Sequence, residues 1–293
     1  INYTVWSDVF VCPQCGKEMV FWDVAVDHEQ GQVREDWRCP GCGAWLSKSP
    51  KKGSGALRVE RAFETKYDRA IGQTVRQAKQ VPVLINYSVG KKRCEKRPDE
   101  GDLALIEKIE NSEIPYPFPT QRLPEGFNTQ QPRESHGLTH VHHFYTRRNL
   151  WMLAALSNKT CYVNITLWKD ILQSISAALT SKLTRYNMGN RGNGPVSGTL
   201  YVSSMFAEAY PIEKFQNKLD DIVSAIGNIK LNGTLLAIST NSSHQLILEE
   251  KFIDYIFIDP PFGSNLMYSE LNFLWEAWLG VFTNNVPEAI VNK

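Results

Sequence analysis

The amino-acid sequence predicts an α/β protein with a mostly parallel sheet, joined to a small β subdomain held together by cysteines. Two observations carry this prediction: helical and short apolar segments alternate from about residue 144, and four cysteines near the start form two C-x-x-C pairs. Strands that alternate with helices are typical of parallel sheets. A chain of 293 residues, 42% apolar and 22% charged, can bury a full core and has the composition of a globular protein.

The two C-x-x-C pairs are the first recognisable element. Each pair puts two thiolates on a tight turn with a glycine behind it, and four sulfurs can close a tetrahedral zinc site. Disulfides and a redox dithiol are the alternatives, but no secretion signal opens the chain and two matched Cys-Pro turns fit redox chemistry poorly. We therefore predict a closed structural Zn site within residues 1–52. Its ligands are Cys12, Cys15, Cys39 and Cys42.

The spacer between the two pairs has strand character, so residues 19–26 and 33–38 are predicted to form a hairpin. The two other cysteines match neither pair: Cys94 is expected in a loop and Cys161 in a core.

Residues 53–143 are predicted to be a mixed insertion and connector that could recognise the target. Residues 81–87 are the clearest strand, while residues 114–137, which begin with alternating prolines, are expected to be long and irregular. The basic stretch 91–97 is either a phosphate contact or a solvated loop.

A histidine cluster lies at His140, His142 and His143. A second metal site is conceivable there, but no acidic residue lies nearby in the sequence at ligand spacing. Phosphate contact and aromatic packing are the alternatives.

Residues 144–293 have the α/β pattern. Helices are expected at 147–157, 167–183, 211–226 and 267–281, and strands at 199–203, 234–238 and 253–258. In the last helix, Leu271, Leu274, Trp275 and Trp278 share one face and are expected to pack on the sheet. Tyr268 and Glu270 are candidates to line a pocket.

The segment 254–262 contains the most specific motif. An apolar run, Tyr255-Ile-Phe-Ile258, is predicted to be a buried strand that stops at Asp259, because neither following proline can continue a ladder. The Asp259 carboxylate would then lie at the carboxyl edge of the sheet, where open α/β sheets place their ligands. An acid, two prolines and an aromatic ring could there hold an exocyclic amine and stack on its base. The simpler alternative is a strand end followed by a proline turn.

Asp259-Pro-Pro-Phe262 resembles the catalytic motif of DNA methyltransferases that modify adenine N6 or cytosine N4. With the flanking segments 252–263 and 268–279, the chain resembles prokaryotic adenine-specific methylases that carry an embedded zinc ribbon. The likeness extends more weakly to residues 144–150 and 197–201. The resemblance implies a partial Rossmann-like S-adenosylmethionine-dependent methyltransferase sheet with an inserted zinc ribbon.

The resemblance also implies the function. The chain would transfer a methyl group from S-adenosylmethionine to adenine N6 in DNA. The catalytic residues would be Asp259, Pro260, Pro261 and Phe262, within a catalytic half at 144–293.

A glycine-rich cofactor loop of the Phe-x-Gly-x-Gly type is not recognisable. The candidates at 41–43, 53–55 and 189–198 do not follow a strand, so cofactor-binding residues stay unassigned. The resembling family carries this loop before its zinc ribbon, so we expect the chain to be a fragment without the cofactor half. An RNA or cytosine-N4 substrate is one alternative. A noncatalytic zinc-ribbon nucleic-acid-binding protein with a degenerate methylase fold is another.

Composition bears on the expected cellular location and on the expected partners. No stretch approaches 18 uncharged apolar residues and no signal peptide is recognisable, so we expect no membrane partner and a cytoplasmic location. The net charge of +1 neither demands nor excludes nucleic acid, so any DNA-binding surface must be local.

Overall fold

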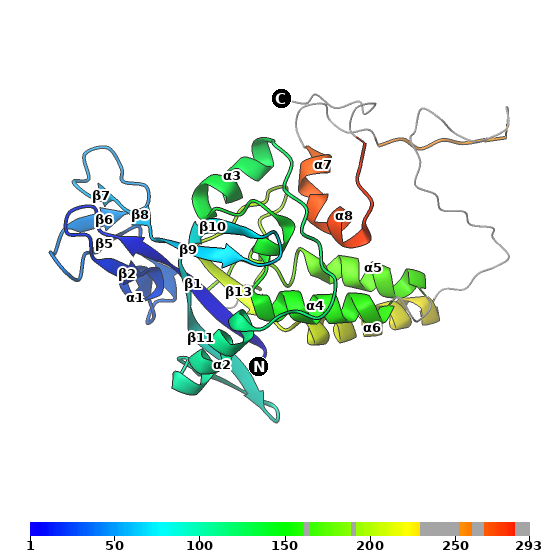
Figure 1. Ribbon diagram of the computed structural model, residues 1–293, viewed down its shortest axis with the longest axis horizontal. Coiled ribbons are helices and arrows are strands. Elements are labelled where there is room, and N and C mark those ends of the chain that lie inside the picture. Colours follow the sequence, from blue (N-terminus) through cyan, green and yellow to red (C-terminus); the bar gives the residue numbers. More distant parts are fainter. Residues whose placement is uncertain (161–164, 189–191, 229–251, 260–266, 285–293) are drawn as a thin grey trace.

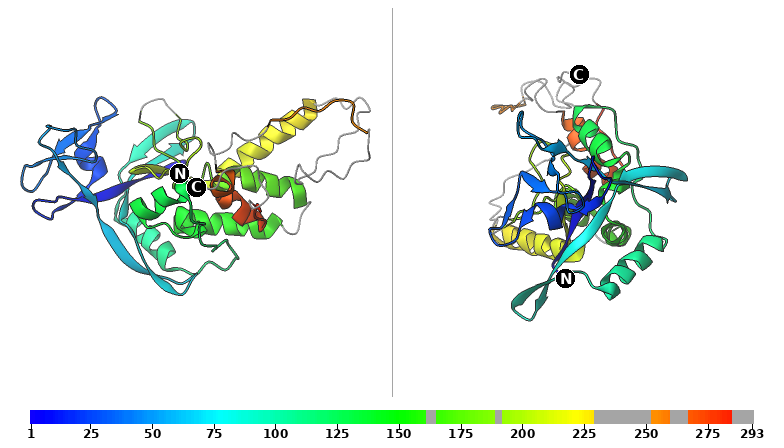
Figure 2. Two further views of the ribbon diagram at one scale, coloured as in Figure 1. Left: turned by 90° about the horizontal axis from the view of Figure 1, so that it is seen from above. Right: turned by 90° about the vertical axis from the view of Figure 1, so that its left-hand side faces the viewer.

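A computed structural model describes residues 1–160, 165–188, 192–228, 252–259 and 267–284. The chain is a mixed α/β protein (Figure 1). Figures 1 and 2 show the cysteine-bearing region at one end, a twisted sheet in the middle and a group of helices at the other end.

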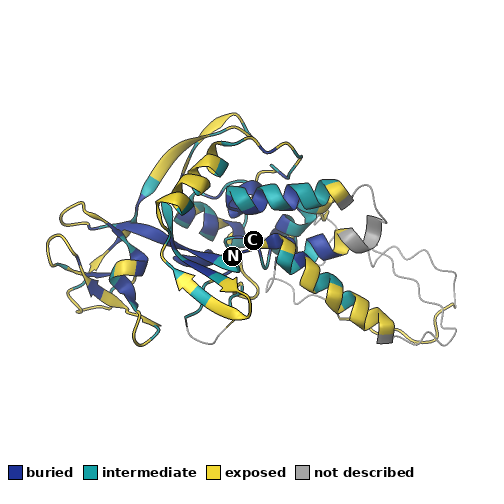
Figure 3. Ribbon diagram, turned by 90° about the horizontal axis from the view of Figure 1, so that it is seen from below, coloured by how far each residue is buried: buried dark blue, intermediate teal, exposed yellow. Residues whose placement is uncertain are grey.

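Strand β1 (Tyr3–Val11) organises the central sheet. It pairs on one side with β11 (Gln80–Val89) and on the other with β13 (Met205–Ala209), and β12 (Lys92–Lys96) extends the sheet beyond β11. The far end of β1 pairs with β2 (Glu18–Val20) and β8 (Glu60–Arg61). Most of β1 is buried, so this strand joins the cysteine-bearing region to the central core (Figure 3).

The prediction of a mostly parallel sheet is wrong for the described strands. Every pair in the central sheet is antiparallel, and the one parallel pair within the described residues joins β6 (Trp45–Ser47) to β7 (Leu57–Arg58). Two residues connect β11 to β12, a connection that permits only antiparallel pairing. From residue 144 onward, the described strand is β13, which adds to the edge of β1 in the antiparallel direction.

The predicted C-terminal segments 199–203 and 253–258 are not strands in the structure. Residues 199–203 have no strand, and β13 begins two residues later. Residues 234–238 lie outside the described residues. Residues 253–258 are irregular and exposed, with Tyr255 and Phe257 each 82% exposed. Figure 1 shows this segment in orange, away from the central sheet. A buried strand was the wrong prediction here, because no described strand lies alongside to complete a ladder.

The predicted helices are largely confirmed. Three of them, α4 (Arg147–Thr160), α5 (Ile165–Ser176) and α6 (Pro211–Asn228), pack around one apolar core that includes Phe144, Leu153 and Ile175. Helix α5 stops seven residues before the predicted end at 183, and turns follow it.

The last predicted helix divides into α7 (Tyr268–Leu271) and α8 (Phe273–Leu279). Leu274 is fully buried, and Leu271, Trp275 and Trp278 pack partly buried against the same core. The shared face of this segment is therefore confirmed, but α8 contacts helix α5 rather than a sheet.

The connector at 120–137 contains a helix that the sequence did not predict, α3 (Phe127–His136). Its polar sequence has little apolar periodicity and contains Pro132, so pattern alone argued against a helix. The Glu270 carboxylate, from a distant element, accepts a hydrogen bond from the Asn128 amide at 2.7 Å. This contact satisfies one of the backbone N–H groups in the first turn, which have no partner within the helix. Tertiary contact therefore stabilises this helix.

Gly137 ends α3 in the left-handed region, with φ of 69°. A Cβ at this position would lie 2.1 Å from the backbone carbonyl oxygen of Arg76. We expect Gly137→Ala to lower the free energy of unfolding by more than about 2 kcal/mol, because the left-handed conformation alone costs roughly 1–2 kcal/mol and the backbone contact adds to it. Denaturant titration measures the change.

Gly90→Ala is the matched control. Gly90 also has a positive φ, 60°, but a Cβ there meets nothing within 4 Å. This variant is expected to lose only the roughly 1–2 kcal/mol of the left-handed conformation. Equal losses in the two variants would show that the contact with Arg76 contributes nothing.

The remaining described elements surround this frame. They are α2 (Glu100–Asn111), η1 (Val141–Phe144), the hairpin of β9 (Phe63–Asp68) and β10 (Gln73–Ala78), and the elements of the cysteine-bearing region, α1 (Phe21–Ala25), β3 (Val26–Asp27), β4 (Gln32–Val33) and β5 (Asp36–Arg38).

Candidate metal centre

The four predicted cysteine ligands come together in space. Two turns with the same hydrogen bonds carry them: Gly16 N–H donates to the Cys12 carbonyl at 2.9 Å, and Gly43 N–H donates to the Cys39 carbonyl at 3.0 Å. Both glycines have positive φ, 71° and 75°, which is why a glycine follows the second cysteine of each pair. The two C-x-x-C segments thus form a matched pair of knuckles.

The sulfur positions fit a tetrahedral metal. Cys12 Sγ lies 3.7 Å from Cys42 Sγ, and Cys15 Sγ lies 3.7 Å from Cys39 Sγ. A tetrahedral Zn²⁺ with bonds of about 2.3 Å would separate its sulfurs by about 3.8 Å. The cluster can therefore hold a metal such as zinc, and its four thiolates would leave no coordination position for a substrate.

The electrostatics of the site favour a thiolate at Cys39. Burial raises the pKa of this thiol, but hydrogen bonds from the backbone amides of Cys42 and Gly41 and from the Cys12 and Cys15 thiols together outweigh burial and lower the pKa to about 6. The Gly41 amide lies 3.4 Å from Cys39 Sγ. Backbone N–H groups aimed at sulfur stabilise its charge, which a metal thiolate also requires.

An aromatic cluster belongs to the same apolar core as Cys12 and Cys39. Phe10 of β1, Phe21 of α1 and Trp37 of β5 pack with ring centroids 5.5–6.5 Å apart.

The predicted hairpin of 19–26 with 33–38 is only partly correct. Residues 26–27 pair with 32–33, but residues 21–25 are helical. The helix buries Phe21, Trp22 and Ala25 together, an arrangement that a five-residue pattern could not distinguish from a strand.

The other cysteines lie apart from the cluster. Cys94 is in strand β12, not in the loop that the sequence predicted, and is partly buried. Cys161 lies outside the described residues.

The predicted catalytic motif is only partly described. Asp259 is exposed, and the described residues bring no other predicted site residue to it. Pro260, Pro261 and Phe262 lie outside the described residues. The geometry of this motif therefore stays a prediction.

Of the two candidate pocket residues, Glu270 is buried and accepts the Asn128 amide, while Tyr268 is 44% exposed. Neither of them lines the cavity of about 620 Å³ next to the β9–β10 hairpin. Glu270 thus has a structural role at the start of α3.

The structure shows one cluster that the sequence missed. Asp68, at the end of β9, contacts both His142 and His143 of η1. The pairs are 74 and 75 residues apart in the chain, so spacing near the histidines could not reveal the acid. Burial raises the pKa of Asp68, but the hydrogen bonds from the two histidines outweigh burial and lower it to about 2.

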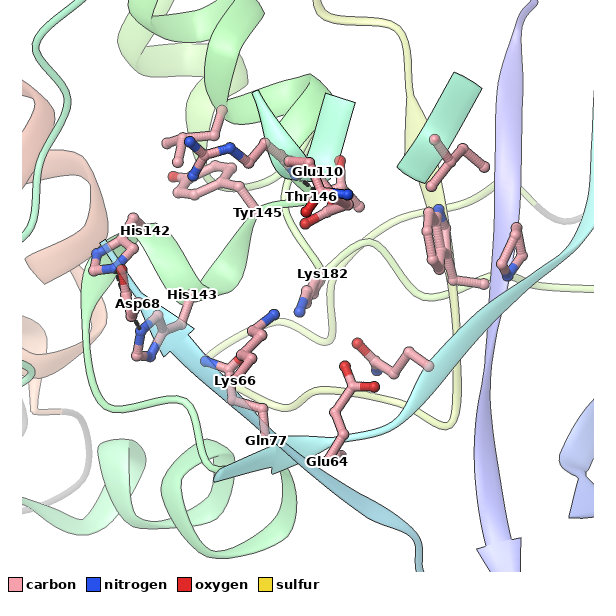
Figure 4. Close-up of a pocket in the computed structure, with 18 of the residues that line it drawn as sticks. Glu64, Lys66, Asp68, Gln77, Glu110, His142, His143, Tyr145, Thr146 and Lys182 are labelled. Carbon is pink, nitrogen blue, oxygen red and sulfur yellow. Dashed lines mark hydrogen bonds and ion pairs between the residues drawn. The ribbon is translucent and has the colours of Figure 1, made fainter. Parts of the chain in front are cut away.

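This cluster borders a cavity of about 620 Å³ between the β9–β10 hairpin, η1 and the central sheet. Figure 4 shows Asp68, His142 and His143 on one side of it, with Lys66 and Lys182 pointing into the middle. Burial lowers the pKa of Lys182 to about 8. The cavity thus contains both metal-ligand and cationic groups.

Comparison of the chain with protein-family models, curated proteins and solved structures found no match. Within the described residues, no helix combines the length and apolarity needed to cross a membrane.

Proposed function

We propose that this chain belongs to an S-adenosylmethionine-dependent methyltransferase that modifies adenine N6 in DNA, with the four-cysteine cluster as its structural zinc ribbon. The observation that carries the proposal is the Asp259-Pro-Pro-Phe262 motif in its sequence context: an apolar run before it and the aromatic segment 268–279 after it. A partial Rossmann-like sheet and a cytoplasmic location are part of the same proposal, supported by the sequence alone.

The chemistry assigned to the motif is positioning. The target adenine would leave the duplex, as bases must for chemistry on their edges. Asp259 and the Pro260 carbonyl would accept hydrogen bonds from the exocyclic amine, and Phe262 would stack on the base. S-adenosylmethionine supplies an electrophilic methyl group when bound, and its binding residues stay unassigned. No covalent intermediate with the protein is needed.

DNA would approach a basic tip of the β11–β12 hairpin. Lys91, Lys92 and Arg93 are exposed there, whereas Lys96 and Arg97 form ion pairs with acidic residues of the chain. The first three cations are therefore better placed to neutralise phosphates.

Asp259→Ala tests the proposal. In the full-length protein supplied with S-adenosylmethionine and unmethylated DNA, we expect this variant to lose methyl transfer by at least about a hundredfold, while DNA binding changes little. Mass spectrometry of digested DNA identifies the methylated base and distinguishes adenine N6 from cytosine N4.

Asp254→Ala provides the control, because Asp254 is also exposed and lies five residues earlier outside the motif. It should keep wild-type transfer. Unchanged turnover in Asp259→Ala would refute the role of the motif.

A noncatalytic nucleic-acid-binding protein is the second candidate. The four-cysteine cluster, the exposed tip cations and the unrecognised glycine loop favour it. It predicts salt-dependent DNA or RNA binding by the wild-type chain without methyl transfer from S-adenosylmethionine in the full-length protein.

A further inference from the structure

Three side chains from two distant segments converge at one edge of the cavity. His142 Nε2 lies 2.7 Å and His143 Nε2 lies 2.8 Å from the same oxygen, Asp68 Oδ2. The other carboxylate oxygen of Asp68 accepts the Ala70 amide at 2.9 Å, which fixes the orientation of the carboxylate. All three side chains are at least nine-tenths buried.

The spacing of these atoms approaches that of ligands around a single ion. Two imidazole nitrogens and a carboxylate oxygen form a ligand set that Zn²⁺ and related divalent transition metals accept. Around a tetrahedral ion, bonds of about 2.0–2.2 Å would separate neighbouring ligand atoms by roughly 3.3–3.6 Å. The observed separations are 2.7 and 2.8 Å, so each histidine nitrogen would have to move away from the Asp68 oxygen by roughly 0.5–0.9 Å on metal binding.

Metal binding would also fix the protonation of the two histidine rings. A metal at Nε2 requires the proton at Nδ1. His142 Nδ1 is buried and has no hydrogen-bond partner among the described residues. His143 Nδ1 accepts the Thr139 amide at 3.2 Å, so a metal at Nε2 would require this hydrogen bond to break. The Nδ1–H formed in that tautomer could donate to Thr139 Oγ1, which lies 3.5 Å away.

We propose that Asp68, His142 and His143 form a second metal site, distinct from the four-cysteine cluster, that binds a divalent transition-metal ion such as Zn²⁺. Three protein ligands leave at least one coordination position, and the same residues line the cavity, so that position faces a space large enough for water and a small ligand. The four-cysteine cluster is closed, whereas this site is open.

The number of zinc ions bound per chain tests the proposal directly. The full chain is stripped with a chelator under reducing conditions, reloaded with Zn²⁺ and passed over a desalting column. Elemental analysis should give two zinc ions per chain. An Asp68→Asn, His142→Gln double variant should retain one, and Cys39→Ser should also retain one. One zinc per wild-type chain would overturn the proposal without any variant.

Cobalt loading separates the two sites. Co²⁺ in the double variant should keep the intense thiolate charge-transfer absorption of a four-sulfur site, which also shows that the cysteine region has folded. Co²⁺ in Cys39→Ser should show only the weaker absorption of a nitrogen and oxygen site.

His140→Gln is the matched control. His140 packs against both histidines, with ring centroids 5.8 and 5.2 Å away, but it does not converge on Asp68. It should retain two zinc ions. Two zinc ions in the double variant would show that Asp68, His142 and His143 form a purely hydrogen-bonded cluster. Loss of one zinc ion in His140→Gln, as in the double variant, would show that the proposed ligand set is wrong.

Discussion

Replacing Cys39 with serine is expected to release the metal from the four-cysteine cluster and to unfold the region around it. Cys39 is buried and provides one of four converging sulfurs. Structural zinc contributes about 10–16 kcal/mol in zinc-finger peptides, which is as large as the roughly 5–15 kcal/mol that stabilises a typical domain. The small aromatic core of Phe10, Phe21 and Trp37 cannot replace that contribution.

Zinc content and thermal unfolding measure this effect. We expect the loss of one zinc ion per chain, a lower unfolding temperature and faster proteolysis near residues 12–47. Chelator treatment of the wild-type chain should produce the same changes.

Cys94→Ser is the control, because Cys94 is a partly buried cysteine outside the cluster. It should keep its metal and its unfolding temperature. If Cys39→Ser retained full zinc and stability, the cluster would not be a metal site.

Glu208→Leu is expected to destabilise the junction between the central sheet and the helices by about 3–5 kcal/mol. Glu208 is 5% exposed and its carboxylate accepts the Trp6 indole N–H at 2.7 Å and the Arg148 Nε at 3.1 Å. The Thr146 hydroxyl donates to it as well. Leucine would leave the partly buried Arg148 guanidinium without its carboxylate, and an uncompensated charge costs more than the pair contributes.

Denaturant unfolding of three further variants separates this explanation from a general effect of the substitution: Glu213→Leu, Arg148→Met, and Arg148→Met combined with Glu208→Leu. Glu213→Leu removes a glutamate whose lysine neighbour is 3.7 Å away at the surface, and should cost less than about 1 kcal/mol. Arg148→Met combined with Glu208→Leu should recover much of the loss, because it removes the unpaired charge. Additive losses in this double variant would contradict the proposed coupling between the two residues.

The buried contact between Trp6 and Glu208 at this junction shows why the sequence alone does not predict which strands pair. Trp6 and Glu208 are 202 residues apart. Neither belongs to a motif, and their pairing follows from the register of β1 with β13, in which Thr4 lies opposite Glu208. A strand pattern predicts that a strand exists, but its partner and direction depend on which other strand offers a complementary buried face.

The sequence by itself determined the features whose causes are local. The C-x-x-C spacing and the glycines behind it were sufficient to predict the cluster of Cys12, Cys15, Cys39 and Cys42, because each knuckle is a turn of a few residues. The amphipathic periodicity at 147–157 and 211–226 predicted α4 and α6 for the same reason.

Only the tertiary structure decided the features that need distant partners. Helix α3 depends on Glu270, strand β13 adds to β1 in the antiparallel direction, and Asp68 reaches His142 and His143 across 74 and 75 residues. Local patterns report the conformation that a segment prefers. They do not report which surfaces meet, and burial of a charge or a metal ligand depends on that meeting.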